Sequence, residues 1–305
     1  MKVLVLLHSV TGNTRLMTRY AASCITQAGH VCRIHDIVEK PKPPALGTVE
    51  LLGIACPTMY FRPTFAMEGF VARLPAAKKP TPAFLLATAG GEPGAHFFLL
   101  AEQVARKGYV ALGAHWVIFP ESWPPHRALA QRVEKGAPYG EALCRRYPVL
   151  RPWLSIAWPE IGVPMAEDRE RLRRFIARML EKASGFVPEA APAIRDLHRP
   201  MPGFDLMGRM VTLGMAGQYT APRLVAERCT RCGVCVKVCP VGCITRESKK
   251  AMPVFGPGCS GCWSCFQHCP ERAIAGWKAG PGEGRYPGPS QELSELFRPV
   301  SSACV

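Results

Sequence analysis

Residues 229–240 read CTRCGVCVKVCP, and residues 259–270 repeat the same cysteine spacing as CSGCWSCFQHCP, 30 positions further along the chain. Each run has the form C-x2-C-x2-C-x3-C-P, and nine of the 14 cysteines of the chain lie between Cys229 and Cys269. In a reducing compartment, cysteines this dense bind metal or take part in redox chemistry more often than they form disulfides. The stretch therefore predicts a small metal-binding domain near the C-terminal end.

This spacing resembles that of the bacterial two-cluster ferredoxins, in which the fourth cysteine of each run ligates the other cluster. Two-residue spacers let three thiolates curl round one cubane, and the longer spacer with its proline carries the chain toward the partner cluster. The resemblance implies two [4Fe–4S] clusters. Cluster I would be held by Cys229, Cys232, Cys235 and Cys269, and cluster II by Cys259, Cys262, Cys265 and Cys239.

Two points stay open at this stage. Two four-thiolate zinc sites are an alternative, although they would need only C-x-x-C pairs rather than two complete runs. Cys243 is the ninth cysteine of the region, and we predict a buried free thiol, because cysteine packs well as a small hydrophobe. Exchange of Cys243 with a ligand is the other possibility.

Composition limits the class of protein. The chain has 305 residues, enough for about two domains, and 48% apolar with 20% charged residues is typical of a globular protein. Lys and Arg number 38 against 23 Asp and Glu, which gives a formal net charge of +15. No apolar run is long enough for a signal peptide or a spanning helix. We therefore expect a soluble, cytoplasmic protein.

The N-terminal stretch combines a strand, a hydroxyl-rich loop and a helix. Residues 2–7 predict a buried parallel strand, residues 8–14 read HSVTGNT, and residues 15–28 predict a helix. The loop amides and the helix dipole would point at an anion, so the segment is typical of a phosphate cradle. The loop contains no lysine, which argues against a nucleoside triphosphate site. An ordinary capped turn is the alternative.

Strands and helices then alternate as far as residue 119. We predict strands over residues 31–35, 51–56, 83–88 and 110–119, and helices over residues 64–74 and 95–107. This alternation predicts a doubly wound α/β fold with a five-stranded parallel sheet. Ligands of such sheets lie at the carboxyl ends of the strands, where three of the loops gather.

The first loop and the two that follow resemble the flavin loops of the flavodoxin family, which implies bound FMN. The matching residues are Ser9, Thr11, Gly12, Asn13 and Thr14 in the phosphate loop, Pro57, Thr58, Met59, Tyr60 and Phe61 in the second loop, and Thr88, Ala89, Gly90 and Gly91 in the third. By the resemblance Tyr60 would stack on the isoalloxazine or flank it, whereas plain core packing is the alternative for Tyr60 and Phe61. Arg62 would face either the flavin edge or solvent, and His96 would open a helix rather than catalyse.

A flavodoxin loop and a ferredoxin module in one chain resemble the flavodoxin–ferredoxin fusion family. We expect a flavodoxin-like FMN domain at 1–183 with an insertion at 120–164, a linker with an apolar helix at 184–225, a ferredoxin domain at 226–278 and an extended tail at 279–305. The insertion is rich in proline and carries Trp123, Tyr139, Tyr147, Trp153 and Trp158. Residues 167–182 predict an amphipathic helix, and the Met-rich stretch 204–216 is expected to pack between the domains or to meet a partner or membrane surface.

The two modules together predict an iron–sulfur flavoprotein that passes electrons between its clusters and FMN, and so links a low-potential, ferredoxin-level donor to a partner redox enzyme. A flavin-dependent reductase of a small substrate such as a quinone is the alternative. No catalytic residue is legible, and no G-x-G-x-x-G fingerprint supports direct oxidation of NAD(P)H. The basic charge fits an acidic partner protein, while no reader motif supports nucleic acid binding. A homo-oligomer remains open.

Overall fold

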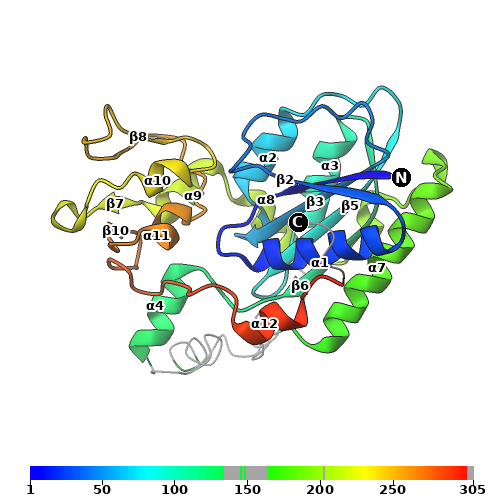
Figure 1. Ribbon diagram of the computed structural model, residues 1–305. Helices are drawn as coiled ribbons and strands as arrows, with labels where there is room; N and C mark the ends of the chain where they lie inside the picture. The colour runs from blue at the N-terminus through cyan, green and yellow to red at the C-terminus, as the bar shows by residue number, and fades with distance from the viewer. Residues whose placement is uncertain (134–144, 146–147, 149–163, 202, 301–305) are drawn as a thin grey trace. The chain divides into compact units, whose positions relative to one another are not determined.

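The computed structural model describes residues 1–133, 145, 148, 164–201 and 203–300. Chain contacts divide it into two compact units. The sheet unit comprises Met1–Phe119, Val163–Met210 and Pro289–Val305, and the cysteine unit comprises Pro120–Gly162 and Val211–Gly288. Figure 1 shows the elements of each unit.

The sheet unit is built on five parallel strands in the order β2-β1-β3-β5-β6. The strands are β1 (Lys2–Leu7), β2 (Val31–Asp36), β3 (Leu51–Met59), β5 (Thr81–Ala89) and β6 (Tyr109–Ile118). A two-residue strand, β4 (Arg62–Pro63), runs antiparallel to the end of β3. Ignoring β4, the order is 2-1-3-4-5, that of the flavodoxin-like doubly wound sheet. The predicted fold class is confirmed.

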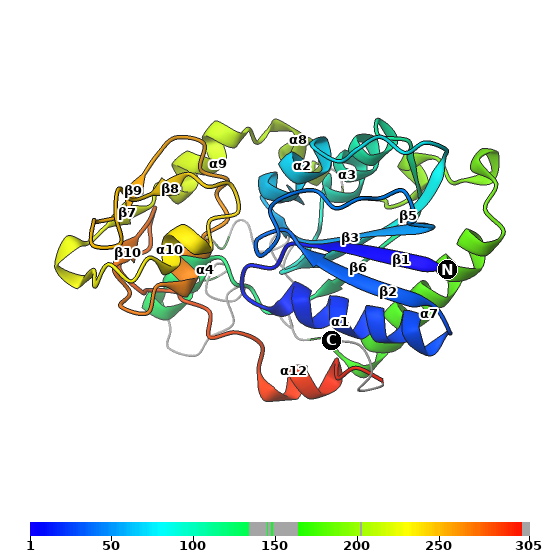
Figure 2. The same ribbon diagram turned by 45° about the horizontal axis from the view of Figure 1, so that its top comes forward.

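Alternating side chains of the strands face two helical layers. Val3, Val5 and Leu7 of β1 belong to the core beneath α1 (Asn13–Gln27) and α7 (Ala166–Ser184). Leu4 and Leu6 belong to the core beneath α2 (Phe65–Ala72) and α3 (His96–Ala105). This two-residue alternation is the geometry of a strand buried on both faces. Figure 2 shows helices on both sides of the sheet.

Helix α7 confirms the amphipathic pattern read from residues 167–182. Its buried residues are Leu172, Phe175, Ile176, Met179 and Leu180. The helix lies close to β6, because a Cβ atom placed on Gly113 would stand 2.8 Å from the Met179 Cε atom. Because Gly113 has no side chain, Met179 can occupy this space.

The end of the chain differs from the expected extended tail. After Pro289 it forms α12 (Gln291–Leu296), which Ser290 caps by accepting a hydrogen bond from the Leu293 backbone N–H. Phe297 is fully buried, with its ring 5.8 Å from that of Tyr20 and 5.4 Å from that of Phe119. Leu293 and Phe297 are four residues apart and so share one face, which covers the sheet unit.

The cysteine unit is made of short elements. Its helices are α4 (Pro124–Val133), α9 (Leu213–Thr220), α10 (Val234–Lys237), α11 (Ser264–His268) and the 3-10 turn η4 (Ala226–Arg228). Strand β7 (Arg223–Leu224) pairs antiparallel with β10 (Ile274–Ala275), and β8 (Ile244–Thr245) pairs antiparallel with β9 (Val254–Phe255). Small antiparallel pairs of this kind match the expected second domain.

The start of the predicted insertion packs within the cysteine unit rather than within the sheet unit. The Gln267 side chain donates a 2.8 Å hydrogen bond to the Ser122 carbonyl, and the Gly284 N–H donates one of 3.0 Å to the Gln131 side chain. These bonds involve backbone groups far away in sequence, which a composition shift cannot reveal. Tyr139, Tyr147, Trp153 and Trp158 lie outside the described residues.

The connecting segment 184–225 is shared between the units. It holds the 3-10 turns η2 (Pro188–Ala190) and η3 (Ile194–Asp196), followed by α8 (Phe204–Met210) in the sheet unit and α9 in the cysteine unit. Leu206, Met207 and Met210 of α8 are exposed, and Phe204 is buried. Within the described ranges, no helix is both long and apolar enough to cross a membrane.

Candidate functional site: thiol-lined hollows and flavin loops

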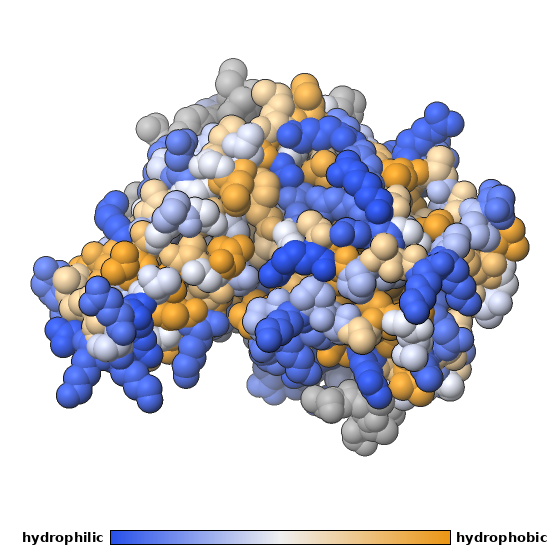
Figure 3. All heavy atoms as spheres, turned by 90° about the horizontal axis from the view of Figure 1, so that it is seen from above, coloured by the Kyte–Doolittle hydropathy of each residue, from blue (hydrophilic) through white to orange (hydrophobic). Residues whose placement is uncertain are grey.

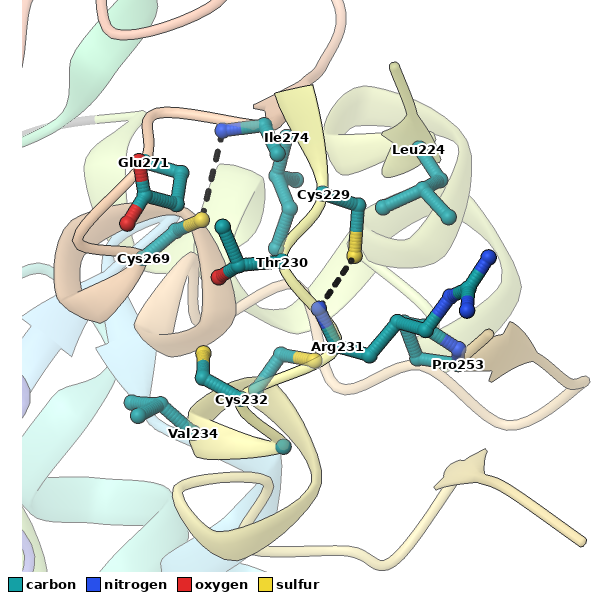
Figure 4. A pocket seen from close by; sticks show the side chains of 13 residues that line it. Leu224, Cys229, Thr230, Arg231, Cys232, Val234, Pro253, Cys269, Glu271 and Ile274 are labelled. Carbon is teal, nitrogen blue, oxygen red and sulfur yellow. Dashed lines mark hydrogen bonds between the residues drawn. The ribbon is translucent and has the colours of Figure 1, made fainter. Parts of the chain in front are cut away.

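Two hollows in the cysteine unit are lined by thiols from both runs. Hollow I is lined by Cys229, Cys232, Cys235 and Cys269 and has an empty volume of about 340 Å³, part of it open solvent. Figure 4 shows the Cys229, Cys232 and Cys269 side chains facing a common space. Hollow II measures about 300 Å³ on the same basis. Its thiols are those of Cys239, Cys243, Cys259, Cys262 and Cys265.

The structure therefore groups the cysteines as the sequence suggested. The fourth cysteine of each run lies with the first three of the other run. Each hollow has a thiol for every iron of a cubane, because a [4Fe–4S] cluster takes four cysteine thiolates. In the described part of the chain, no three His, Cys, Asp or Glu side chains are placed to hold a single metal ion. The donor set thus fits iron–sulfur clusters, although the ligand assignment itself remains a prediction.

Backbone N–H groups point at the sulfurs of hollow I. The Arg231 N–H donates to the Cys229 Sγ atom at 3.4 Å, and the Ala273 N–H donates to the Cys269 Sγ atom at 3.2 Å, both drawn in Figure 4. Such bonds favour the charged thiolate, and in cluster proteins they help set the reduction potential.

The internal repeat extends to the backbone. Three positions in each half adopt the left-handed conformation, and each recurs 30 residues later. The pairs are Arg231 with Gly261, Gly233 with Trp263, and Gly242 with Arg272. Helices α10 and α11 and strands β8 and β10 occupy matching places. The left-handed conformation of Arg231, Trp263 and Arg272 could have been anticipated only from an alignment of the two halves. In that alignment each of the three residues is paired with a glycine.

The surroundings of the two hollows differ. Cys232 at hollow I is exposed, as is Arg231 beside it. At hollow II Cys262 and Cys265 are buried, and Trp263 is only 2% exposed with its ring packed edge-on against Phe266. Burial raises the pKa of the Cys262 thiol to about 11. A thiolate there needs the positive charge of bound iron.

Cys243 lies in hollow II as a fifth thiol. Its Sγ atom is 3.5 Å from that of Cys239, and it is half-buried rather than fully buried as expected. In the second half of the repeat the matching residue is Ala273, which is 1% exposed.

The three candidate flavin loops follow adjacent strands β1, β3 and β5. In the first loop Gly12 has φ 100° and caps α1, and the Ser9 hydroxyl accepts a 3.1 Å hydrogen bond from the Arg15 N–H. The Thr14 hydroxyl lies 2.7 Å from that of Thr88, which joins the first loop to the third. A glycine turn that feeds the N-terminus of a 15-residue helix fits a phosphate group.

The other predicted flavin residues fall at this same edge. Thr11 is half-buried and Asn13 is buried. Pro57, Thr58 and Met59 form the end of β3, Ala89 ends β5, and Gly90 and Gly91 follow it as a bend. The structure therefore brings all three loops to the carboxyl edge of the sheet.

The second loop is a two-residue hairpin turn made of aromatic residues. Tyr60 and Phe61 have φ values of 55° and 59°, and the flanking pairs are Met59 with Arg62 and Thr58 with Pro63. Two left-handed residues in succession define a type I′ turn, where asparagine and glycine are usual.

Contacts from two other segments support this strained turn. The Ala95 N–H donates a 2.8 Å hydrogen bond to the Phe61 carbonyl, and the Phe61 ring centre is 4.7 Å from that of Phe204 in α8. Core packing is thus the observed role of Phe61. Tyr60 stays half-buried beside it.

Arg62 takes neither of the roles considered for it. Its Nη2 atom donates to both carboxylate oxygens of Glu68 at 3.0 and 2.9 Å, and its Nη1 atom donates to the Gly208 carbonyl at 3.2 Å. The pair is mostly buried, with side-chain exposures of 11% and 8%. Burial raises the pKa of Glu68, and the Arg62 charge opposes that rise. Arg62 therefore ties α8 to α2.

Two buried histidines near the loops lie within hydrogen-bond distance of threonine hydroxyls, and no sequence pattern indicated these contacts. The His96 Nδ1 atom is 3.0 Å from the Thr58 hydroxyl, and the His8 Nδ1 atom is 2.8 Å from the Thr64 hydroxyl. Burial lowers the pKa of His96 to about 3 and that of His8 to about 4. Both imidazoles are therefore neutral near pH 7. His96 opens α3, as expected, and also supports Thr58.

Comparison with known proteins adds to the geometry. The family described as 4Fe-4S binding domain matches residues 222–245, which contain the first cysteine run. The pyruvate synthase subunit PorD of Methanothermobacter marburgensis is 36% identical over 53 residues, which cover 17% of this chain. The chain spans 60% of the length of that relative.

Solved structures similar to the chain include flavodoxins. A flavodoxin from the domain Archaea covers 60% of this chain and 99% of its own length at 16% identity, with a TM-score of 0.39. Flavodoxin 1 from Bacillus cereus covers 59% and 98% at 13% identity, with a TM-score of 0.39. An azoreductase from Bacillus anthracis covers 58% and 99% at 9% identity, with a TM-score of 0.35. The chain thus combines a sheet in the flavodoxin-like strand order with a segment, residues 222–245, that matches the 4Fe-4S binding domain.

Proposed function

We propose that the protein carries electrons between two [4Fe–4S] clusters and one FMN, and links a low-potential, ferredoxin-level donor to a partner redox enzyme. The observation that carries this proposal is the pair of hollows, each lined by thiols from both cysteine runs. A bound cluster passes single electrons, and a bound flavin exchanges one or two. Both cofactors in one chain would convert between single electrons and pairs.

The residues of the cysteine unit would hold the clusters without leaving an open iron position. Cys229, Cys232, Cys235 and Cys269 would ligate cluster I, and Cys259, Cys262, Cys265 and Cys239 would ligate cluster II. Four thiolates per cluster favour electron transfer over binding of a substrate to iron. The buried Trp263 lines hollow II, whereas the exposed Cys232 lines hollow I.

The residues of the sheet unit would hold FMN at the carboxyl edge. Ser9, Gly12 and the N-terminus of α1 would bind the phosphate, and the second and third loops would flank the isoalloxazine. Arg15, which lies beside the loop, pairs with the Asp36 carboxylate at 2.7 Å. The loop would therefore rely on amides and hydroxyls rather than on a free cation.

A basic surface next to hollow I would receive the partner. The segment 226–250, which contains the exposed Cys232, has five exposed basic residues against two exposed acids. The basic residues are Arg228, Arg231, Lys237, Lys249 and Lys250. Figure 3 shows hydrophilic side chains projecting from one edge of this unit, at the left of the view. This charge fits an acidic electron carrier that docks close to cluster I.

The test is a cofactor count on protein purified without oxygen. We expect about eight irons, with matching sulfide, and about one FMN per chain. Cys229→Ser and Cys259→Ser should each lose one cluster, about four irons, while Cys32→Ser in the sheet unit loses none. Zinc in place of iron, or no flavin, would overturn the proposal. Rapid turnover of a quinone by the loaded protein would favour the reductase instead.

A further inference from the structure

Hollow II contains one thiol more than a four-thiolate cluster needs. Cys243 lines it together with the four expected ligands, and its Sγ atom lies 3.5 Å from the Cys239 Sγ atom. The Cys243 thiol also hydrogen bonds with Cys259. The extra thiol thus lies between two ligands of the same cluster.

Hollow I has no counterpart to this thiol. Ala273 occupies the matching position 30 residues later, and its methyl group can donate no hydrogen bond. The peptide N–H donor is common to both halves: Ala273 N–H bonds the Cys269 sulfur, and Cys243 N–H bonds the Cys239 sulfur. The side-chain donor is the difference between the two sites.

A cysteine that ligates no iron carries its S–H proton near neutral pH, because the ordinary pKa of a cysteine thiol is about 8.5. Cys243 is such a fifth thiol, and it lies beside the Cys239 sulfur in hollow II. A protonated S–H group is a donor, although a weak one, and the sulfur of an iron-bound cysteine is an acceptor. A hydrogen bond to such a sulfur withdraws negative charge from the cluster, and therefore favours the reduced form.

We propose that Cys243 is a positioning residue for cluster II that donates its S–H group to the Cys239 or Cys259 sulfur and raises the reduction potential of this cluster above the value it would otherwise have. The inference rests on the proposed function in that hollow II must hold a [4Fe–4S] cluster. Cys243 would thus tune the reduction potential of cluster II without being an iron ligand.

The test compares potentials in the holoprotein, by anaerobic titration followed by EPR. Cys243→Ala introduces the residue found in the other half of the repeat. We expect one of the two cluster couples to shift downward, by up to about a tenfold change in the reduced-to-oxidised ratio, or about 59 mV for a one-electron couple. Cys243→Ser keeps a hydroxyl donor and should recover most of the shift. Cys32→Ala, in the sheet unit, is the matched control and should move neither couple.

Three outcomes would overturn the proposal. Unchanged potentials in Cys243→Ala would show that the thiol does not tune the cluster. Loss of about four irons in that variant would show that Cys243 is a ligand. Equal shifts in Cys243→Ser and Cys243→Ala would assign the effect to packing. If the unaltered protein itself lacks a second cluster, the proposed function fails first, and the iron count distinguishes that case.

Discussion

Replacement of Gly12 by alanine tests whether the first loop is the phosphate cradle. Gly12 has φ 100° and ψ −23°, so an L-residue there pays about 1–2 kcal/mol for the left-handed backbone. Its Cβ atom would also stand 3.0 Å from the Pro289 Cδ atom, closer than ordinary contact. We therefore expect Gly12→Ala to lower the free energy of unfolding by about 1–2 kcal/mol or slightly more.

Gly29 offers a matched control at the other end of α1. It has φ 82°, and a Cβ atom placed on it meets nothing within 4 Å. Gly29→Ala should therefore cost a similar conformational free energy, about 1–2 kcal/mol, without a clash and away from the loop. The two variants separate loss of stability from loss of the binding site.

The deciding assay is FMN binding, followed by the quenching of flavin fluorescence, beside urea unfolding of both variants. Relief of the strain would turn the Gly12 peptide and shift the first amides of α1, which are the proposed phosphate donors. We expect Gly12→Ala to weaken FMN binding at least tenfold, or about 1.4 kcal/mol, and Gly29→Ala to leave it unchanged. Equal affinities in the two variants would refute the phosphate-cradle assignment.

Three further predictions concern stability and docking. Phe297→Ala should lower the free energy of unfolding by about 3–5 kcal/mol in urea, because it empties a fully buried site, whereas the exposed Val300→Ala should change it little. His8 and His96 have folded pKa values of about 4 and 3, below the unfolded value of 6.5, so the unfolded chain binds more protons and stability should fall as the pH drops below about 6.5. Each contributes a slope of about 1.4 kcal/mol per pH unit, and His8→Asn should remove one such contribution in pH-dependent unfolding. Reversing the charges of Arg231 and Lys237 should slow electron transfer with an acidic flavodoxin or ferredoxin most at low salt, whereas reversing Lys78 and Lys79 in the sheet unit should not; equal effects would contradict docking at hollow I.

The sequence predicted the sheet because its signal is local. Each strand is a short apolar run between polar loops, and each helix carries its apolar residues on one face, as Leu172 and Phe175 of α7 illustrate. The loops at the strand ends followed from the same alternation. The cysteine grouping was implied by the resemblance to the two-cluster ferredoxins, because spacing alone places only the first three thiols of each run together and does not say where the fourth lies.

Features that depend on contacts between distant segments could not be predicted in this way. Phe297 looks like part of a polar tail, yet it fills a site between Tyr20 and Phe119. Residues 120–133 look like an insertion in the sheet, yet Ser122 and Gln131 bond to the cysteine unit. A hydrogen bond between a side chain and the backbone of a distant residue cannot be read from the residue types in the sequence.

Arg62 shows how burial decides among the roles that a sequence allows. An arginine after a flavin loop could face a ligand or solvent, and the pattern alone favours neither. The buried Glu68 carboxylate settles the choice, because a charge in that position must be paired. Arg62 meets that need and also bonds Gly208, so it supports the strained turn of Tyr60 and Phe61 from the α8 side.

The repeat in the cysteine unit separates what fixes geometry from what tunes chemistry. The two halves share their cysteines and their three left-handed positions, so they must build hollows of similar shape. They differ at the residues around those hollows: Cys232 is exposed where the matching Cys262 is buried, and Cys243 stands where the other half has Ala273. Water access and hydrogen bonds to sulfur are the two levers by which a protein sets the potential of a cluster with fixed ligands. One backbone used twice would thus hold two clusters that differ in exposure and potential.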